Sequence, residues 1–208
     1  MPAISPVTLA LIVGNAAVFF LMQTLPDTMV PLFALWPFGP SVVAPMGAGM
    51  QFQPWQMITY AFMHGSLTHL LVNMFALYMF GGQLEGVWGR RRYFNFYLIC
   101  IVSAAAVQLL VVNATGGNYP TVGASGAVFG LLLAYAMYFP NRTVMLIIPP
   151  IPMPAWLFVT LYGLLELYLG VTGSQAGVAH FAHLGGMLGG FLMIQHWRGR
   201  FPFRRRRR

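Results

Sequence analysis

Charged residues are scarce in this chain of 208 residues. They make up 7% of the sequence, while hydrophobic residues make up 58%. A soluble domain has about 25% charged residues, so this chain cannot cover a water-facing surface, and most of its exterior must face lipid. The formal net charge of +8 rests on few residues that are not spread over a soluble fold, and we expect no nucleic-acid partner.

Lysine is absent, and the chain has three acids and one cysteine. The lone Cys100 excludes an internal disulfide, and we interpret it as a small apolar residue within a helix. The first residues lack the basic flank and cleavage site of a signal peptide, and they lack the arginine- and serine-rich character of a transit sequence. We therefore expect the first apolar segment to be retained as a membrane span.

Six apolar segments approach the roughly 20 residues that a helix needs to cross a bilayer. They cover residues 7–25, 67–86, 94–113, 124–139, 154–171 and 178–196. The fourth is short, which is tolerable if its outer end begins below the surface and is surrounded by protein. No repeat or linker divides the chain. The sequence thus predicts one all-α, six-helix membrane domain over residues 1–208, with an arginine-rich cytoplasmic tail at 197–208.

The basic residues indicate the orientation. All 11 are arginines, and they lie at residues 90–92, 142, 198, 200 and 204–208. With six spans these places share one side, and the positive-inside rule puts that side and both termini in the cytoplasm. We expect a bacterial plasma membrane. Spans two, four and six then begin at the outer face and run inward.

The segment between the first two spans, residues 26–66, is apolar but interrupted by proline and glycine. It is too broken to span the membrane and too apolar to extend into water. We expect it to lie in the membrane interface, with Trp36 and Trp55 at the depth of the lipid headgroups.

Three short polar clusters open spans two, four and six. They contain His69 with Asn73, Gly123-Ala124-Ser125-Gly126, and Ala182-His183-Leu184-Gly185-Gly186. Polar groups within a bilayer are costly, so their presence calls for a reason. Each cluster lies within about two turns of the start of its span, which places all three within roughly 10 Å of one depth. A nucleophile, a base and donors to an oxyanion would account for them.

Ser125 and His183 are the candidates for nucleophile and base. Ser125 lies at a loop-to-helix junction, where free N–H groups favour a developing anion. Small residues four apart allow helices to approach closely, and such residues occur at Gly126, Gly130, Gly185, Gly186, Gly189 and Gly190. Close approach is what a Ser–His hydrogen bond of about 2.6–3.2 Å requires. Alternatively, the serine eases helix packing and the histidine bonds a carbonyl group.

His69 and Asn73 are four residues apart, on one face of span two. Both can donate hydrogen bonds, so they suit an oxyanion hole together with the backbone N–H of Ser125. The alternative is that they bond between helices and only hold the bundle together.

None of the three acids lies beside His183 in the sequence, so we expect a Ser–His dyad without a third member. We expect Glu85 to meet the arginines at 90–92. We assign Glu166, an ionisable residue within a span, a structural or gating role. Asp27 lies in the outer loop.

Two further histidines remain. His64 is expected to bond the backbone of the outer loop, and His180, three residues before His183, could share its helix face. Since no cysteine or carboxylate lies near the histidines in the sequence, we expect neither a metal nor a cofactor.

The clusters, in this order, resemble the rhomboid family of intramembrane serine proteases in its bacterial six-span form. The resemblance covers the chain from about Trp55 to Gly190 and includes residues 55–64, His69, Asn73, Glu85, the Gly-x-Ser-Gly of span four, and Ala182-His183 with the glycines that follow. It implies that Ser125 is the nucleophile and His183 the general base. It also implies His69, Asn73 and the Ser125 amide as oxyanion stabilisers, Phe129 as the ring against His183, and supporting glycines at Gly123, Gly126 and Gly186.

The chain departs from the family pattern at two positions. Many relatives have Trp-Arg where this chain has Trp55-Gln56, which puts the usual bonding of the outer loop in question. Some relatives have tyrosine where Phe129 stands, so a hydroxyl contact is absent there.

The resemblance implies an endopeptidase whose partners are membrane lipids and transmembrane protein substrates, which it cleaves near the outer face. Two alternatives remain at this point. One is a catalytically silent rhomboid-like protein that binds membrane clients. The other is a small proton-coupled transporter that uses Glu166 and the histidines as a proton path.

Overall fold

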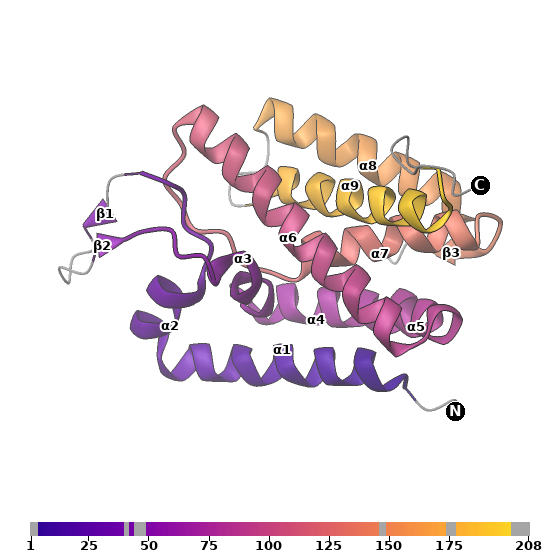
Figure 1. The fold of residues 1–208 in the computed structure, drawn as a ribbon, viewed down its shortest axis with the longest axis horizontal. Coiled ribbons are helices and arrows are strands. Elements are labelled where there is room, and N and C mark those ends of the chain that lie inside the picture. The colour runs from indigo at the N-terminus through magenta and orange to yellow at the C-terminus, as the bar shows by residue number, and fades with distance from the viewer. Residues whose placement is uncertain (1–3, 40–41, 44–48, 146–148, 174–177, 201–208) are drawn as a thin grey trace, which may run out of the picture.

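The computed structural model describes residues 4–39, 42–43, 49–145, 149–173 and 178–200, and the chain is mostly helical (Figure 1). The helices are α1 (Pro6–Thr24), α2 (Pro26–Phe33), α3 (Gln56–Thr59), α4 (Leu67–Ala76), α5 (Gly82–Trp88), α6 (Arg90–Thr115), α7 (Ser125–Tyr138), α8 (Ala155–Thr172) and α9 (His180–Trp197). A 3-10 turn, η1 (Tyr60–Phe62), follows α3, and a π-helical segment, η2 (Leu77–Gly81), joins α4 to α5.

Two short antiparallel hairpins complete the described elements. β1 (Val42–Val43) pairs with β2 (Gly49–Met50) in the loop before α3, and β3 (Thr143–Met145) pairs with β4 (Pro152–Pro154) between α7 and α8. An isolated antiparallel bridge between Leu35 and Thr121 ties the first of these loops to the segment before α7.

Helices occupy all six ranges predicted to span the membrane. Among the described residues, four runs are long and apolar enough to cross it: α1, the continuous run Leu67–Trp88, α6 and α8. The apolar helix α7 has 14 residues and is the short one, as expected. The 18-residue α9 is rich in glycine and histidine and is not among the four. The predicted polytopic all-α membrane bundle is confirmed. The arginine-rich tail lies largely outside the described residues.

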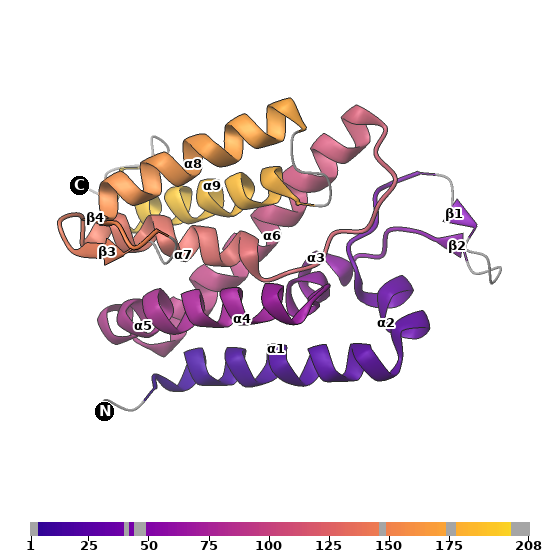
Figure 2. The same cartoon turned by 180° about the vertical axis from the view of Figure 1, so that it is seen from behind.

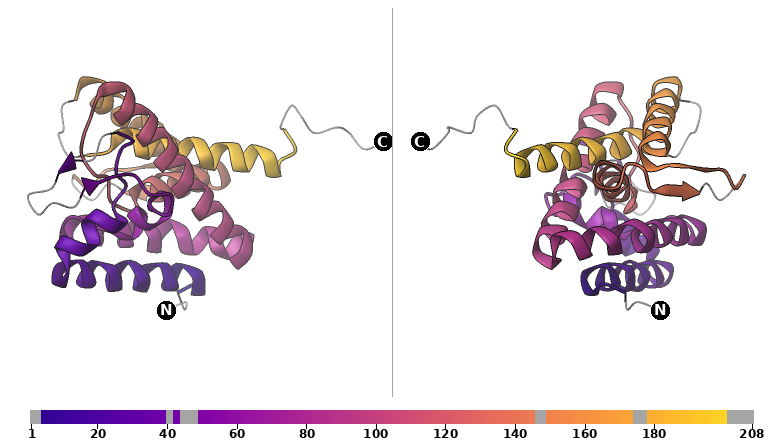
Figure 3. Two further views of the ribbon diagram at one scale, coloured as in Figure 1. Left: turned by 60° about the vertical axis from the view of Figure 1, so that its left-hand side comes forward. Right: turned by 90° about the vertical axis from the view of Figure 1, so that its right-hand side faces the viewer.

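Helices α4, α7 and α9 run in one direction, whereas α1 and α8 run the opposite way (Figures 1 and 2). The start of α1 and the end of α9 lie at the same end of the bundle. Figure 3 shows α1 and α8 at opposite edges of the molecule, with α7 and α9 between them. This arrangement brings the starts of three parallel helices into one region.

The glycines of α9 contact two neighbouring helices, α6 and α7. A Cβ atom on Gly185 would lie 2.7 Å from Val107 Cβ of α6, and Ser103 Oγ of α6 donates a 2.8 Å hydrogen bond to the Gly185 carbonyl. Gly186 instead faces α7, where a Cβ atom would overlap the carbonyl of Gly126. The α9 backbone therefore contacts two helices at once.

Glu85 binds the beginning of α1, and the expectation that it meets the arginines at 90–92 is wrong. Its Oε1 accepts from the Val7 N–H at 3.0 Å, and its Oε2 accepts from the Thr8 N–H at 2.8 Å and the Thr8 hydroxyl at 2.9 Å. The first N–H groups of a helix have no partner within the helix and attract negative charge. The buried carboxylate of Glu85 supplies these N–H groups with hydrogen-bond acceptors and with a negative charge.

The loop before α4 has a small core of its own, formed by Met29, Ala34, Trp36 and Met63. Trp36 is buried in this core, and its Nε1 donates to the Val30 carbonyl at 3.2 Å; its depth in the membrane stays a prediction. Trp55 is 48% exposed, and its Nε1 donates to the Leu32 carbonyl.

Gln56, at which the chain departs from the pattern of the family that it resembles, is fully buried at the centre of this loop. Its Oε1 accepts from the N–H groups of Trp36 at 3.3 Å and Gln53 at 3.1 Å. Its Nε2 donates to the carbonyls of Pro31 and Leu32 at 3.3 Å each. An uncharged amide thus ties three segments of the loop together.

Candidate active site

Ser125 and His183 are in direct contact. The distance from Ser125 Oγ to His183 Nε2 is 2.7 Å, within hydrogen-bonding range. Ser125 is the first residue of α7, and His183 lies in the first turns of α9, so two parallel helices bring their starts together. Among the described residues, the N–H of Ser125 has no backbone acceptor. A hydroxyl, an imidazole and a free amide therefore meet at one point.

Backbone packing holds these two helices at that spacing. A Cβ atom on Gly126 would lie 2.5 Å from Ala104 Cβ of α6 and 3.2 Å from the Ala182 carbonyl of α9. One turn on, Gly130 packs against Cys100 and the carbonyl of Gly186. No side chain separates α7 from α9 at these positions, and this is what allows a serine to reach a histidine.

The ring of Phe129 stacks on His183. Their centroids are 4.3 Å apart and their planes differ by 6°, and Tyr162 of α8 also stacks on Phe129 at 5.5 Å. Phe129 therefore lies where the resemblance places it. The stack restricts rotation of the imidazole about its own axis.

His69 lies beside Ser125 across Gly123. A Cβ atom on Gly123 would meet the His69 ring at 2.7 Å and Ser125 Oγ at 3.6 Å, so the imidazole and the hydroxyl flank one point. Gly123 has φ +127°, a conformation that strains other residues. The hydroxyl of Ser66 accepts from the His69 N–H at 3.1 Å and so caps α4, which sets where this helix begins.

Asn73 follows His69 on the same helix face and is buried. Its Nδ2 donates a 3.0 Å hydrogen bond to the carbonyl of His69, within its own helix. In the described part of the structure its amide makes no hydrogen bond to Ser125 or His183. The structure thus brings His69 to the site more directly than Asn73.

Glu166 lies beside His183, at the ring edge opposite Ser125. The expectation that no carboxylate lies beside His183 is therefore wrong. The Oε2 atom of Glu166 lies 2.7 Å from Nδ1 of His183 and 2.7 Å from Nδ1 of His180. All three side chains are buried. The acid is distant in sequence but adjacent in space, because α8 and α9 are antiparallel neighbours.

A helical stripe in the sequence could have identified this contact. The buried residues of α8 are Ala155, Val159 and Glu166, and Gly163 and Gly170 share the same face. A Cβ atom on Gly170 would lie 3.2 Å from His180 Cβ. Small residues before and after an acid indicate a face that packs closely against another helix.

Glu166, His180 and His183 are of types that bind metal ions, and their ligand atoms lie within 4.8 Å of one another. Zinc takes nitrogen and oxygen ligands at about 2.0–2.2 Å. The 2.7 Å separations are those of direct hydrogen bonds, so the carboxylate and the imidazoles already satisfy one another. The expectation that no metal is bound stays a prediction.

The loop before α4 supports the site from outside the spans. Tyr60 donates to the Ile101 carbonyl at 2.9 Å, and its own carbonyl accepts from the Gly123 N–H at 3.0 Å. His64 is fully buried and meets the His69 ring edge-to-face at 4.9 Å. Burial and the neighbouring His69 lower the pKa of His64 to about 4. His64 is therefore neutral at physiological pH and packs beneath His69.

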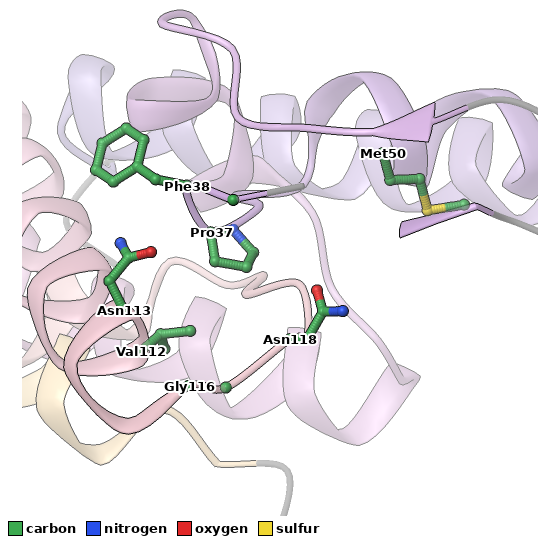
Figure 4. A pocket seen from close by; sticks show the side chains of 9 residues that line it. Pro37, Phe38, Met50, Val112, Asn113, Gly116 and Asn118 are labelled. Carbon is green, nitrogen blue, oxygen red and sulfur yellow. The ribbon is translucent and has the colours of Figure 1, made fainter. Parts of the chain in front are cut away.

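A hollow away from these residues lies between the loop before α3 and the end of α6 (Figure 4). Pro37, Phe38, Met50, Val112 and Asn118 are among the residues that line it. None of the lining residues is titratable, so this hollow offers no acid or base, and the polar cluster at the starts of α4, α7 and α9 remains the candidate site.

Comparisons with known proteins identify the family. A family model of the rhomboid domain matches residues 51–198. The chain is 32% identical over 143 residues to Rhomboid protein 1, mitochondrial, of Saccharomyces cerevisiae, covering 64% of this chain and 38% of the relative. It is 28% identical over 206 residues to the mouse Presenilin-associated rhomboid-like protein, mitochondrial, covering 92% of this chain and 50% of the relative.

The RHOMBOID-like protein 4 of Arabidopsis thaliana is 34% identical over 147 residues, covering 67% of this chain and 33% of the relative. The chain thus spans half or less of the length of these relatives. The family match begins in the outer loop and includes the starts of α4, α7 and α9, which carry His69, Ser125 and His183. This chain is a multi-pass membrane protein of the rhomboid family.

Proposed function

We propose that this protein is an intramembrane serine endopeptidase in which Ser125 attacks a peptide carbonyl and His183 is the general base. The observation that carries the proposal is the 2.7 Å separation between Ser125 Oγ and His183 Nε2 in a site between membrane helices. A hydroxyl is a weak nucleophile at its ordinary pKa and needs an adjacent base to remove its proton. The imidazole is held in position for that step by Phe129.

In the proposed reaction, the proton of Ser125 moves to His183 Nε2 as Oγ bonds to the carbonyl carbon. The carbonyl oxygen then carries a negative charge, which the N–H of Ser125 and the imidazole of His69 stabilise, with Asn73 as a further donor. His183 returns its proton to the leaving amine, and water hydrolyses the acyl-enzyme by the same steps in reverse order. A preorganised donor of this kind contributes about 10²–10³-fold to kcat.

The substrates are proposed to be transmembrane protein segments. Ser125 is at the start of α7, far from the end of the bundle where the arginines gather. There Arg198 donates to the Met137 carbonyl, Arg142 bonds Gln83, and the Arg92 guanidinium lies over the Trp197 ring. The positive-inside rule assigns the arginine end to the cytoplasm. We accordingly propose that both termini lie on the cytoplasmic side of a bacterial plasma membrane and that cleavage occurs near its outer face.

Purified protein in detergent, incubated with a single-span model substrate and separately with a fluorophosphonate probe, tests this proposal. The wild type should cut the substrate and label with the probe, whereas Ser125→Ala should do neither and His183→Ala should lose cleavage. Leu167→Ala, at a 46% exposed position on α8, is a control for handling in detergent. Equal labelling of wild type and Ser125→Ala would reject the nucleophile.

A further inference from the structure

Glu166 is a buried carboxylate that pairs with neither a lysine nor an arginine in the described part of the chain; it contacts two imidazoles instead. Resting on the function proposed above, we propose that Glu166 is a positioning residue for His183 and that His180 holds Glu166 in place. Ser125, His183, Glu166 and His180 then form one chain of hydrogen bonds across α7, α9 and α8.

The first argument concerns the tautomer of His183. An ionised carboxylate can only accept hydrogen bonds, so the Nδ1 atom of His183 that faces Glu166 must carry the proton. The Nε2 atom of the neutral ring is then left with a lone pair, and it is this atom that lies 2.7 Å from Ser125 Oγ. The carboxylate selects the tautomer that can accept the proton of the serine.

The second argument concerns charge. When His183 takes the proton it becomes a cation within the bilayer, where an unpaired charge is costly. Glu166 is the acid that lies beside it: Glu85 binds the start of α1, and Asp27 lies in the first turn of α2. A carboxylate at 2.7 Å stabilises the imidazolium as it forms, without itself being protonated.

The third argument concerns His180, which shares the same oxygen. Its Nδ1 lies 2.7 Å from Glu166 Oε2, and its Nε2 is buried and makes no hydrogen bond to any described residue. A proton on that Nε2 would be an unsatisfied buried donor, so the neutral ring with its proton on Nδ1 fits the site. His180 thus donates to the carboxylate and fixes its orientation, as the side chains that hydrogen-bond metal ligands orient those ligands in metal sites.

Helix α8 supplies a second support at the same place. Tyr162 precedes Glu166 by one turn and stacks on Phe129, which in turn stacks on His183. The imidazole is therefore held on its face by a stacked ring and at its Nδ1 edge by an acid, and α8 contributes to both.

Steady-state cleavage by three variants tests the proposal. Glu166→Gln keeps the size and the accepting oxygen but removes the charge, and it should lower kcat on the order of 10²–10⁴-fold with KM unchanged. His180→Ala should lower kcat about tenfold. His180→Asn retains an N–H donor near the position of Nδ1, so its kcat should be close to that of the wild type. Since both residues act through His183, the double variant Glu166→Gln/His180→Ala should be no slower than Glu166→Gln.

Leu165→Ala, which changes a 45% exposed neighbour of Glu166, is the matched control and should keep wild-type kcat. If Glu166→Gln keeps a kcat within about twofold of the wild type, a change too small for this role, while Ser125→Ala is inactive, the positioning role is overturned and the protease function stands.

Proton NMR of protein labelled with ¹⁵N-histidine gives a readout that needs no substrate. Two downfield imidazole N–H resonances are expected; one should disappear in His180→Asn, and both should move upfield in Glu166→Gln. If no substrate is cut but these signals appear, the hydrogen-bond chain stands and the protease function fails. If the purified protein contains a stoichiometric metal that Glu166→Gln loses, the three residues form a metal site and the inference is overturned.

Discussion

Gly186 of α9 lies directly against the backbone of Gly126 of α7, so that a Cβ atom on Gly186 would overlap the Gly126 carbonyl group. Overpacking of this kind costs about 1–3 kcal/mol, and here it would also push the two helices of the site apart. We expect Gly186→Ala to lower the thermal unfolding temperature in detergent and to slow fluorophosphonate labelling of Ser125.

Gly86→Ala is the matched control for that change. Gly86 is exposed in α5, and a Cβ atom there would meet nothing within 4 Å. Alanine is favoured over glycine in a helix by about 1 kcal/mol, so this variant should be at least as stable as the wild type and should label at its rate. Equal behaviour of the two variants would contradict the packing argument.

Gln56 holds the outer loop together through four hydrogen bonds. Gln56→Ala would leave buried N–H and carbonyl groups without partners, and each such group costs about 1–3 kcal/mol unless water reaches it. We expect a loss of about 2–3 kcal/mol in unfolding free energy and faster hydrogen exchange in the segment from α2 to α3. Gln51→Ala, at an exposed position of the same loop, should change neither.

His69 and Asn73 should contribute unequally to catalysis. Because His69 flanks the point beside Ser125 Oγ while Asn73 bonds within its own helix, His69→Ala should lower kcat about 10²–10³-fold and Asn73→Ala about tenfold or less. Single-turnover cleavage of a model substrate measures both. A larger loss for Asn73→Ala would mean that its amide turns to the oxyanion in the reacting complex.

The buried His64 should make stability depend on pH. Its pKa is about 4 in the folded protein and about 6.5 in an unfolded chain. Above pH 6.5 the imidazole is therefore neutral in both states, and its contribution to the unfolding free energy does not change with pH. As the pH falls from 6.5 to 4, His64 becomes protonated in the unfolded chain but stays neutral in the folded protein, and the unfolding free energy declines. Below pH 4 the decline from this residue ends.

Thermal unfolding in detergent between pH 4 and pH 7.5 measures that decline. The His64→Asn variant lacks the titrating ring, so its unfolding temperature should fall less steeply over the same range. The ring of His69 contacts His64, so the comparison should be repeated in a His69→Asn background. Identical slopes with and without His64 would show that this residue takes up its proton equally well in both states.

The contact between Ser125 and His183 could be anticipated from sequence, because the spans fix which helices run in parallel and the clusters mark their starts. Glu166 was missed, although the small residues before and after it on α8 mark the face that packs closely against α9. Which residue of α9 this face meets depends on the packing of the two helices. Counting acids near His183 in the sequence overlooked a neighbour 17 residues away.

Glu85 was misassigned for a related reason. It was expected to pair with the nearest arginines in sequence, but the free amides at the start of α1 are a buried alternative that only the packed bundle reveals. The core that encloses Trp36 was also not foreseen, because its members are scattered between residues 29 and 63. In both cases the decisive contacts come from tertiary packing.

The bond between Glu85 and the start of α1 bears on how the chain assembles. The opening amides of α1 are satisfied by a side chain that is made 77 residues later. Until the second span is inserted, those amides can be satisfied only by water or lipid headgroups. Helix α1 therefore reaches its final hydrogen-bond partner only after α5 has been made, and mutations at Glu85 should affect biogenesis before they affect the folded protein.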